Sequence, residues 1–319
     1  MNVLIADKFE QAGIDQLCSL GCTVNTDADL TGDSLRMAVG SNGCEVLIVR
    51  STKVSDDVLA AGSSLKLIIR AGAGFDTIDT AAAKQRGIKV ANCPGMNSVA
   101  VAELTFGLML GLDRRIPDNV SDLRGGVWNK KEYGKARGLK GRTLGIVGLG
   151  RIGYEVAVRG KAFDMDLIYS DVIAHESKEQ ELGIRRVSYK EVLRESDFIC
   201  LHVPLNDETR HMISTPQFET MKSTAFIINC SRGGVIDEKA LATAIETGQI
   251  AGAGLDVYEH EPKATDRTCS LDVAQVNRVY GTHHIGASTE QAQLAVAQEV
   301  VRIVGEFKIT GEVLNWVNP

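Results

Sequence analysis

The sequence predicts an α/β protein with two doubly wound parallel-sheet domains, one inserted into the other. Three observations support this fold class. Short apolar runs alternate with helical segments over residues 1–96, and the same alternation resumes at residue 143. A long apolar-faced segment separates the two stretches, and a second such segment lies near the C-terminus. The length of 319 residues also fits two domains better than one.

The first domain is expected to contain short strands rich in Val, Ile and Leu and bounded by Gly, Asn or Asp. We expect these strands at Val3–Ala6, Thr23–Asn25, Val46–Val49, Leu67–Ile69 and Lys89–Ala91. We expect the intervening helices at Gln11–Leu20, Ser34–Val39, Asp56–Ala61 and Thr80–Arg86. Because strands that alternate with helices are joined by crossovers, the sheet should be parallel and covered on both faces.

The second domain repeats this pattern with longer apolar runs. Its strands are expected at Thr143–Val147, Asp166–Tyr169, Phe198–His202, Ala225–Asn229, Gly252–Asp256 and Arg278–Tyr280. Helices are expected between them at Ile152–Phe163, Lys190–Glu195 and Glu238–Thr247. The chain therefore carries two doubly wound units, and only the second contains a glycine-rich turn after its first strand.

Two long apolar-faced segments define how the domains are connected. Val99–Ile116 lies between the domains, and Thr289–Phe307 has an apolar spacing that suits a helix. Because the second segment has no sheet of its own, it should return to the first domain. We therefore expect a discontinuous domain over residues 1–96 and 286–319, an inserted domain over residues 97–285, and a ligand-binding cleft between them.

Composition limits the classes of function. The chain is 44% hydrophobic and 24% charged, with a net charge of −6, so no general attraction to nucleic acid is expected. The seven cysteines show no metal-ligand spacing, which favours free thiols in a reducing cytoplasm and no metal site. No apolar run reaches the roughly 20 residues that span a bilayer, so we expect a cytoplasmic protein without membrane contact.

A glycine motif follows the first strand of the second domain. In Gly148-Leu149-Gly150-Arg151-Ile152-Gly153, the first glycine suits a tight turn, the second suits close approach of a pyrophosphate, and the third suits close helix packing. Asp171 follows the next strand, where a carboxylate can bind an adenosine ribose diol and repel a 2′-phosphate. The pattern predicts a dinucleotide site that favours NAD over NADP.

Three polar residues follow three later strands of the same domain. Arg232, Glu261 and His284 should lie together, because ligands of open α/β sheets bind outside the carboxyl ends of the strands. Histidine can exchange the proton that accompanies hydride transfer, and a carboxylate can orient and stabilise it. Arginine can bind a substrate carboxylate through two hydrogen bonds. The combination indicates a dehydrogenase acting on a small hydroxy acid.

The sequence resembles the D-isomer-specific 2-hydroxyacid dehydrogenase family over nearly its whole length. The matching stretches are Gly148–Gly153, Asn229–Gly234, Leu255–Pro262 and His284–Thr289. Within the family, Val49–Val54 and Arg70–Asp76 resemble the short phosphoglycerate dehydrogenases. The resemblance implies a Rossmann-type NAD-binding domain inserted into a flavodoxin-like substrate-binding domain.

The resemblance also implies roles for individual residues. His284 is implied as the acid/base, Glu261 as its partner and Arg232 as the residue that binds the substrate carboxylate and 2-oxygen. The implied substrate contacts are Arg50 and Arg70 for the phosphate, and the backbone of Ala71, Gly72, Ala73 and Gly74 for the carboxylate. The implied cofactor contacts are Gly148, Gly150, Arg151, Ile152, Gly153, Asp171, His202, Pro204, Thr209, Cys230 and Asp256, the last on the nicotinamide carboxamide.

One departure from the family pattern leaves an alternative open. The family usually has Pro before the catalytic histidine, whereas this chain has His283 there. The spacing to Ile285-Gly286-Ala287 favours His284 as the catalyst, with His283 in a structural or cleft-lining role.

The function that the resemblance implies is NAD-dependent oxidation of 3-phospho-D-glycerate to 3-phosphohydroxypyruvate, the first step of serine synthesis. A glyoxylate or hydroxypyruvate reductase is the alternative if Arg50 or Arg70 is engaged in an ion pair. A less favoured alternative is an NAD-sensing binding protein similar to the corepressors of this family. The resemblance further implies a homodimer built on Val99–Ile116 and the loop that leads to Arg142.

Overall fold

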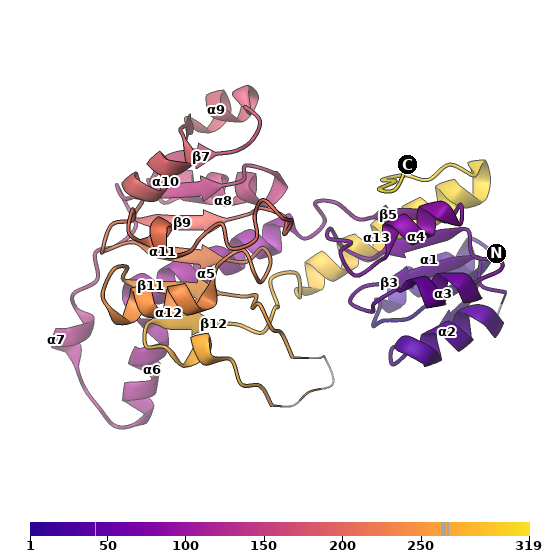
Figure 1. Ribbon diagram of the computed structural model, residues 1–319, viewed down its shortest axis with the longest axis horizontal. Coiled ribbons are helices and arrows are strands. Elements are labelled where there is room, and N and C mark those ends of the chain that lie inside the picture. Colours follow the sequence, from indigo (N-terminus) through magenta and orange to yellow (C-terminus); the bar gives the residue numbers. More distant parts are fainter. Residues whose placement is uncertain (42, 263–265, 267) are drawn as a thin grey trace. The chain divides into compact units, whose positions relative to one another are not determined.

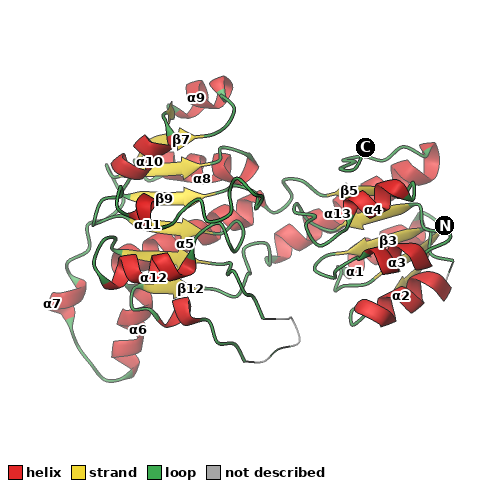
Figure 2. Ribbon diagram, viewed as in Figure 1, coloured by secondary structure: helices red, strands yellow, loops and turns green. Residues whose placement is uncertain are grey.

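The computed structural model describes residues 1–41, 43–262, 266 and 268–319. The chain divides into two compact units, Met1–Asn97 with Ala287–Pro319, and Ser98–Gly286. Each boundary lies one residue beyond the expected position. Figures 1 and 2 show that each unit has a sheet covered by helices on both faces.

The sheet of the first unit has five parallel strands in the order β2-β1-β3-β4-β5. The strands are β1 (Asn2–Ile5), β2 (Thr23–Thr26), β3 (Val46–Val49), β4 (Leu67–Arg70) and β5 (Lys89–Asn92). This is the flavodoxin-like order that doubly wound folds use. Neighbouring strands pair in register, for example Val3 with Val46 and Val46 with Leu67.

Alternating side chains of these strands divide the core of the first unit into two layers. Leu4, Leu47 and Ile68 pack under α2 (Gly32–Ser41), α3 (Asp56–Ala61) and α4 (Thr80–Gln85). Ile5, Ile48 and Ile69 pack under α1 (Gln11–Ser19) and α13 (Glu290–Thr310). The C-terminal helix therefore completes the first sheet's covering, as its apolar spacing predicted.

The sheet of the second unit has seven parallel strands in the order β12-β11-β10-β9-β6-β7-β8. The strands are β6 (Thr143–Val147), β7 (Asp166–Ser170), β8 (Arg185–Arg186), β9 (Phe198–Leu201), β10 (Phe226–Asn229), β11 (Gly252–Leu255) and β12 (Val279–Gly281). Counted from β6, this is the Rossmann order with one strand added at the edge. The direction of winding reverses between β6 and β9, which makes the crevice there the expected ligand position.

The two faces of this sheet have separate helical layers. One face is covered by α5 (Ser98–Arg114) and α8 (Arg151–Ala162), which pack on Leu144, Ile146 and Ile228. The opposite face is covered by α10 (Tyr189–Glu195), α11 (Thr215–Phe218), α12 (Glu238–Glu246) and the 3₁₀ turn Asp272–Gln275. A further helix, α9 (Glu176–Leu182), follows β7. The predicted fold class, two doubly wound parallel-sheet domains, is confirmed.

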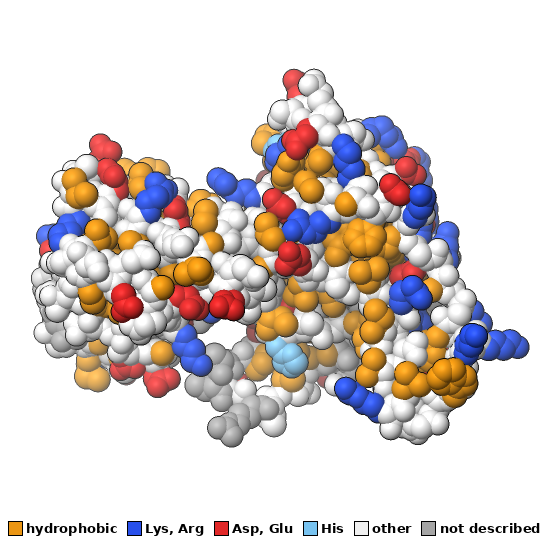
Figure 3. Space-filling model, turned by 180° about the vertical axis from the view of Figure 1, so that it is seen from behind, with side chains coloured by type: hydrophobic (Ala, Val, Ile, Leu, Met, Phe, Trp, Pro, Cys, Tyr) orange, Lys and Arg blue, Asp and Glu red, His pale blue; other side chains and the backbone are white. Residues whose placement is uncertain are grey.

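The long segment after residue 97 differs from the prediction. The expected helix Val99–Ile116 ends at Arg114 because Arg115 adopts a left-handed conformation with φ 50°. The chain continues as α6 (Ile116–Arg124) and α7 (Lys130–Tyr133), and neither helix has a buried residue. Leu123, Val127 and Trp128 are exposed there, Trp128 by 80%. Figure 3 shows hydrophobic side chains beside Lys and Arg side chains at lower right, on the second unit.

The described residues include no helix whose length and apolar character would allow it to cross a membrane.

Candidate active site

The glycine motif lies between β6 and α8, and its glycines have three different surroundings. Gly148 has φ +91°, and a Cβ there would lie 2.5 Å from the carbonyl oxygen of His202. At Gly153, a Cβ would lie 2.1 Å from the carbonyl oxygen of Gly148. Nothing lies within 4 Å of the corresponding position at Gly150. Two glycines therefore allow close packing, and the third leaves open the backbone N–H groups that begin α8, including those of Arg151 and Ile152.

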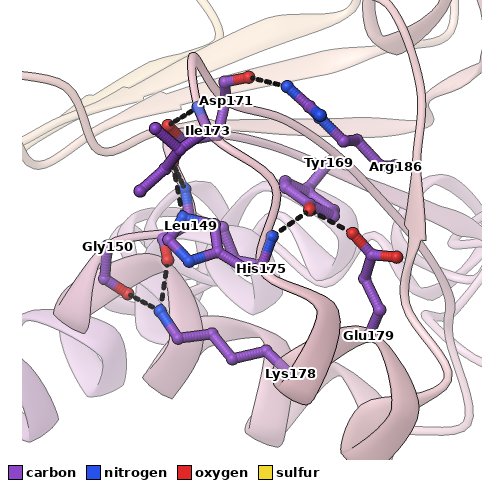
Figure 4. A network of polar contacts seen from close by, with 9 residues as sticks. All are labelled: Leu149, Gly150, Tyr169, Asp171, Ile173, His175, Lys178, Glu179 and Arg186. Carbon is purple, nitrogen blue, oxygen red and sulfur yellow. Dashed lines mark hydrogen bonds and ion pairs between the residues drawn. The ribbon is translucent and has the colours of Figure 1, made fainter.

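Asp171 follows β7 and lies against this glycine loop (Figure 4). Its Oδ2 accepts a hydrogen bond from the backbone N–H of Leu149 at 2.7 Å and lies 3.2 Å from Nε2 of His175. Its Oδ1 accepts from the N–H of Ile173 at 3.3 Å. Burial alone would raise the pKa of Asp171, but these donors hold it below the ordinary value. The side chain is therefore a carboxylate fixed at the ribose end of the predicted site.

The loop after β9 contributes His202, Pro204 and Thr209. The Thr209 hydroxyl donates to the carbonyl of Pro204 at 2.6 Å, which closes this loop on itself. Both ring nitrogens of His202 are buried and have no hydrogen-bond partner among the described residues. Burial lowers the pKa of His202 to about 4, so the ring is neutral. Two unsatisfied nitrogens beside the glycine turn, together with the open space at Gly150, fit a dinucleotide that supplies polar partners.

Cys230 and Asp256 follow the adjacent strands β10 and β11. Burial raises the pKa of the Cys230 thiol to about 12, so the thiol is neutral, and Cys230 packs in the hydrophobic core of this unit. Both carboxylate oxygens of Asp256 bind the next loop: Oδ1 accepts from the Thr282 hydroxyl at 2.6 Å and from the Ile285 N–H at 2.8 Å, and Oδ2 from the Gly286 N–H at 2.8 Å. Sequence reasoning missed this role, since the motif did not indicate that Asp256 clamps the loop carrying His284.

His284 and Glu261 form a direct pair. The Nδ1 of His284 lies 2.8 Å from Oε2 of Glu261, while Oε1 of Glu261 accepts from the Tyr258 N–H at 3.1 Å. Burial alone would raise the pKa of Glu261, but the His284 bond, the Tyr258 N–H and the charge of Arg232 hold it below its ordinary value. Because Nδ1 faces the carboxylate, Nε2 is the nitrogen left for proton exchange.

The backbone at His284 is unusual for a residue with a Cβ. Its φ is 52°, in the left-handed region, and its N–H donates to the Asp256 carbonyl at 2.8 Å. Strain of this kind persists where surrounding hydrogen bonds over-determine the conformation, and it is concentrated at functional sites. The clamp made by Asp256 supplies those bonds.

Arg232 follows β10, in a loop that contacts the loop of Glu261. A Cβ at Gly233 would lie 1.7 Å from the carbonyl oxygen of Tyr258, so only glycine allows these two loops to approach. The Arg232 guanidinium donates to the Ser231 carbonyl at 2.8 Å, and the Asn229 amide donates to the Arg232 carbonyl at 2.9 Å. Arg232, Glu261 and His284 thus form one electrostatically connected group.

His283 has a different environment from His284. Its side chain is exposed and, within the described residues, makes no hydrogen bond or ion pair, whereas His284 is bonded to Glu261. The geometry supports His284 as the acid/base.

The predicted substrate residues of the first unit lie after β3 and β4. The guanidinium of Arg50 donates to the Ser288 hydroxyl at 3.1 Å and forms no salt bridge with a described carboxylate. The guanidinium of Arg70 lies over Gly72, where a Cβ would come within 1.6 Å of Nη1. Gly72 has φ +149°, and its carbonyl oxygen accepts a hydrogen bond from the Cys93 N–H at 2.9 Å.

The loop from Ala71 to Gly74 is anchored at both ends of its turn. The Ala71 N–H donates to the Val49 carbonyl at 2.7 Å, and the Asn92 amide donates to the Ala73 carbonyl at 2.6 Å. These contacts give the loop a fixed backbone, with both arginines beside it in the same unit.

Comparison with known proteins places these features in context. Residues 106–286 match the family model described as D-isomer specific 2-hydroxyacid dehydrogenase, NAD binding domain. The chain is 41% identical to a D-3-phosphoglycerate dehydrogenase of Methanocaldococcus jannaschii over 100% of its own length and 60% of that relative. It is 45% identical to a hydroxypyruvate reductase of Thermotoga maritima, with 84% of this chain and 85% of that relative covered.

A solved structure extends the likeness to the whole fold. The D-lactate dehydrogenase of Aquifex aeolicus, complexed with NAD and lactic acid, superposes with a TM-score of 0.85 at 29% identity, covering 100% of this chain and 99% of that one.

Proposed function

This chain belongs to the D-isomer-specific 2-hydroxyacid dehydrogenase family, and we propose that it oxidises 3-phospho-D-glycerate to 3-phosphohydroxypyruvate with NAD. The observation that carries the proposal is the 2.8 Å pair of His284 and Glu261, in the loops after β12 and β11, with Arg232 after β10. These loops leave the same edge of the sheet as the glycine turn.

The cofactor would be held by the residues around the glycine turn. Gly150 and the start of α8 offer backbone N–H groups to the pyrophosphate, and Asp171 offers a carboxylate to the ribose diol. Cys230, His202 and the loop closed by Thr209 form its remaining surroundings. Bound NAD supplies the acceptor for the hydride that leaves C2 of the substrate.

The three polar residues have separate roles in the proposed reaction. Nε2 of His284 takes the C2 hydroxyl proton as the hydride leaves, and Glu261 stabilises the resulting imidazolium through Nδ1. Arg232 binds the substrate carboxylate and the 2-oxygen, where charge changes during the reaction. In the reverse direction, His284 donates the proton.

The phosphate of the substrate is assigned to Arg50 and Arg70. Two guanidiniums suit a dianionic phosphate better than a single lysine would, and Arg50 forms no salt bridge with a described carboxylate. The backbone from Ala71 to Gly74 is assigned to the substrate carboxylate. Steady-state rates with 3-phosphoglycerate, glycerate, lactate and glycolate test the assignment, and a preference for any unphosphorylated acid would contradict it.

A second candidate is the reduction of hydroxypyruvate or glyoxylate. The observation that favours it is the 45% identity to the Thermotoga hydroxypyruvate reductase over most of both chains. Rates in the reductive direction with 3-phosphohydroxypyruvate and hydroxypyruvate separate the two candidates, because only the phosphorylated acid uses both arginines.

The helices α6 and α7 are proposed to bind a second copy of this chain. Neither helix has a buried residue, and the large apolar side chains of Leu123, Val127 and Trp128 in this segment are exposed. Internal bonds shape the segment: Arg115 pairs with Asp118 and with Glu132, both at 2.9 Å. Pre-formed apolar surface of this kind is typical of a homodimer interface.

A further inference from the structure

Several basic side chains lie around the carboxylate of Asp171, at the ribose end of the proposed cofactor site. Figure 4 shows the network. His175 is four residues after Asp171, and its Nε2 lies 3.2 Å from Oδ2, the same oxygen that accepts the Leu149 N–H. The side chains of both residues are mostly buried, at 16% and 13% exposed. A protonated His175 would therefore place a positive charge directly on the carboxylate that is expected to exclude a 2′-phosphate.

Two further cations are bonded to the backbone beside Asp171. The ammonium of Lys178 donates to the carbonyl of Leu149 at 2.6 Å, and the guanidinium of Arg186 donates to the carbonyl of Asp171 at 3.0 Å. Both groups keep spare donors, since an ammonium has three and a guanidinium five. Burial lowers the pKa of Lys178, while the charge of Asp171 raises it and that of Arg151 lowers it.

The remaining groups near His175 are acidic or neutral. Its backbone N–H donates to the hydroxyl of Tyr169 at 3.0 Å, and that hydroxyl donates to Glu179 at 2.5 Å. The hydroxyl thus stays protonated, because burial and the bond to Glu179 raise the pKa of Tyr169. These contacts fix the position of His175 and leave its imidazole as the side chain in direct contact with the carboxylate of Asp171.

We propose that His175 is a specificity-determining residue for the cofactor. With the imidazole neutral, the charge of Asp171 repels a ribose 2′-phosphate and NAD is bound. With the imidazole protonated, the charge of Asp171 is compensated, and a 2′-phosphate can bind near Lys178 and Arg186, so that NADP is accepted. The inference rests on the dinucleotide site proposed above and is independent of the identity of the hydroxy acid.

Calorimetric titration with NAD and with NADP at about pH 8 and about pH 5.5 tests the proposal without any turnover. We compare the ratio of the dissociation constant of NADP to that of NAD at the two pH values. From about pH 8 to about pH 5.5, this ratio should fall about tenfold more in the wild type than in His175→Gln, as expected for one added charge beside a partly buried carboxylate. The 2′-phosphate of NADP itself gains a proton over this pH interval. Because this protonation affects the wild type and His175→Gln equally, the difference between the two proteins reports the contribution of His175.

Two further variants sharpen the test. His175→Lys carries a permanent charge and should show the low ratio already at about pH 8, which gives an independent test if His175→Gln folds poorly. His211→Gln is the matched control, because His211 also pairs with a carboxylate, Glu259 at 2.9 Å, in a different loop. Its ratio should follow that of the wild type.

The outcomes are distinguishable. The same pH dependence in the wild type and in His175→Gln, with a high ratio in His175→Lys at about pH 8, would overturn the role of His175 and leave the NAD site standing. Failure of the wild type to bind NAD would instead overturn the dinucleotide site and, with it, the proposed function.

Discussion

Replacing Glu261 by Gln tests the acid/base pair with the smallest change of shape. In the wild type, Nδ1 of His284 lies 2.8 Å from Oε2 of Glu261. The glutamine amide has nearly the same volume, and its oxygen can still accept a hydrogen bond from Nδ1, but the negative charge is lost. A hydrogen bond to a charged group contributes about 1.5–3 kcal/mol. Glu261 is 33% exposed, so solvent screening favours the lower end, about 1.5 kcal/mol.

That energy acts on the imidazolium, which forms only as the proton is transferred. The expected result is a fall of about tenfold in kcat/KM for oxidation, because 1.4 kcal/mol corresponds to a factor of ten. NADH binding, followed by fluorescence, should be unchanged.

Glu259→Gln is the matched control. Glu259 lies two positions before Glu261, and its Oε1 lies 2.9 Å from Nε2 of His211. The Glu259→Gln variant therefore loses a comparable contact between a histidine and a carboxylate. It should retain the wild-type kcat/KM. Equal losses in both variants, or a wild-type kcat/KM in Glu261→Gln, would refute the role assigned to Glu261.

The other predictions concern the catalyst, the substrate phosphate and the assembly. His284→Ala should lose most turnover while retaining NADH binding, and His283→Ala should retain turnover; the reverse pattern in rate assays would assign the catalyst to His283. Arg50→Gln and Arg70→Gln should each raise KM for 3-phosphoglycerate about tenfold or more, the value of a charge-assisted bond, and leave rates with hydroxypyruvate nearly unchanged; equal effects on both substrates would contradict the assignment. Leu123→Glu should convert a dimer into a monomer in light scattering after gel filtration, whereas Met37→Glu, an exposed position in the first unit, should not; an unchanged mass in Leu123→Glu would count against the α6–α7 interface.

Much of the fold could be predicted because buried parallel strands leave a clear pattern. Val46–Val49 is apolar throughout and buried on both faces, and its predicted and observed bounds coincide. The strand Arg185–Arg186 was missed because it is a two-residue edge strand with both residues exposed, so it has no apolar run. The break at Arg115 was missed because a single left-handed residue leaves no periodic signal, although Pro117 in the first turn of α6 is consistent with a new helix start.

The site was predictable where chemistry depends on spacing along one loop. The glycine motif indicated a tight turn, an open position and close packing, and the structure has these at Gly148, Gly150 and Gly153. Contacts between distant segments were not predictable in the same way. The clamp of Asp256 on residues 282–286 depends on how two loops meet in space. The contact of His175 with Asp171 lies within one loop, and it depends on the backbone course of that loop. The histidine four residues after Asp171 was the available signal for the second contact.

Isotope transfer tests the central claim most directly. Incubation of the wild-type protein with NAD and 3-phospho-D-glycerate deuterated at C2 should yield NADH that carries the deuterium, detected by mass spectrometry, and His284→Ala should yield very little. The absence of labelled NADH from the wild type, under conditions where NAD binds, would contradict the proposed hydride transfer from this substrate.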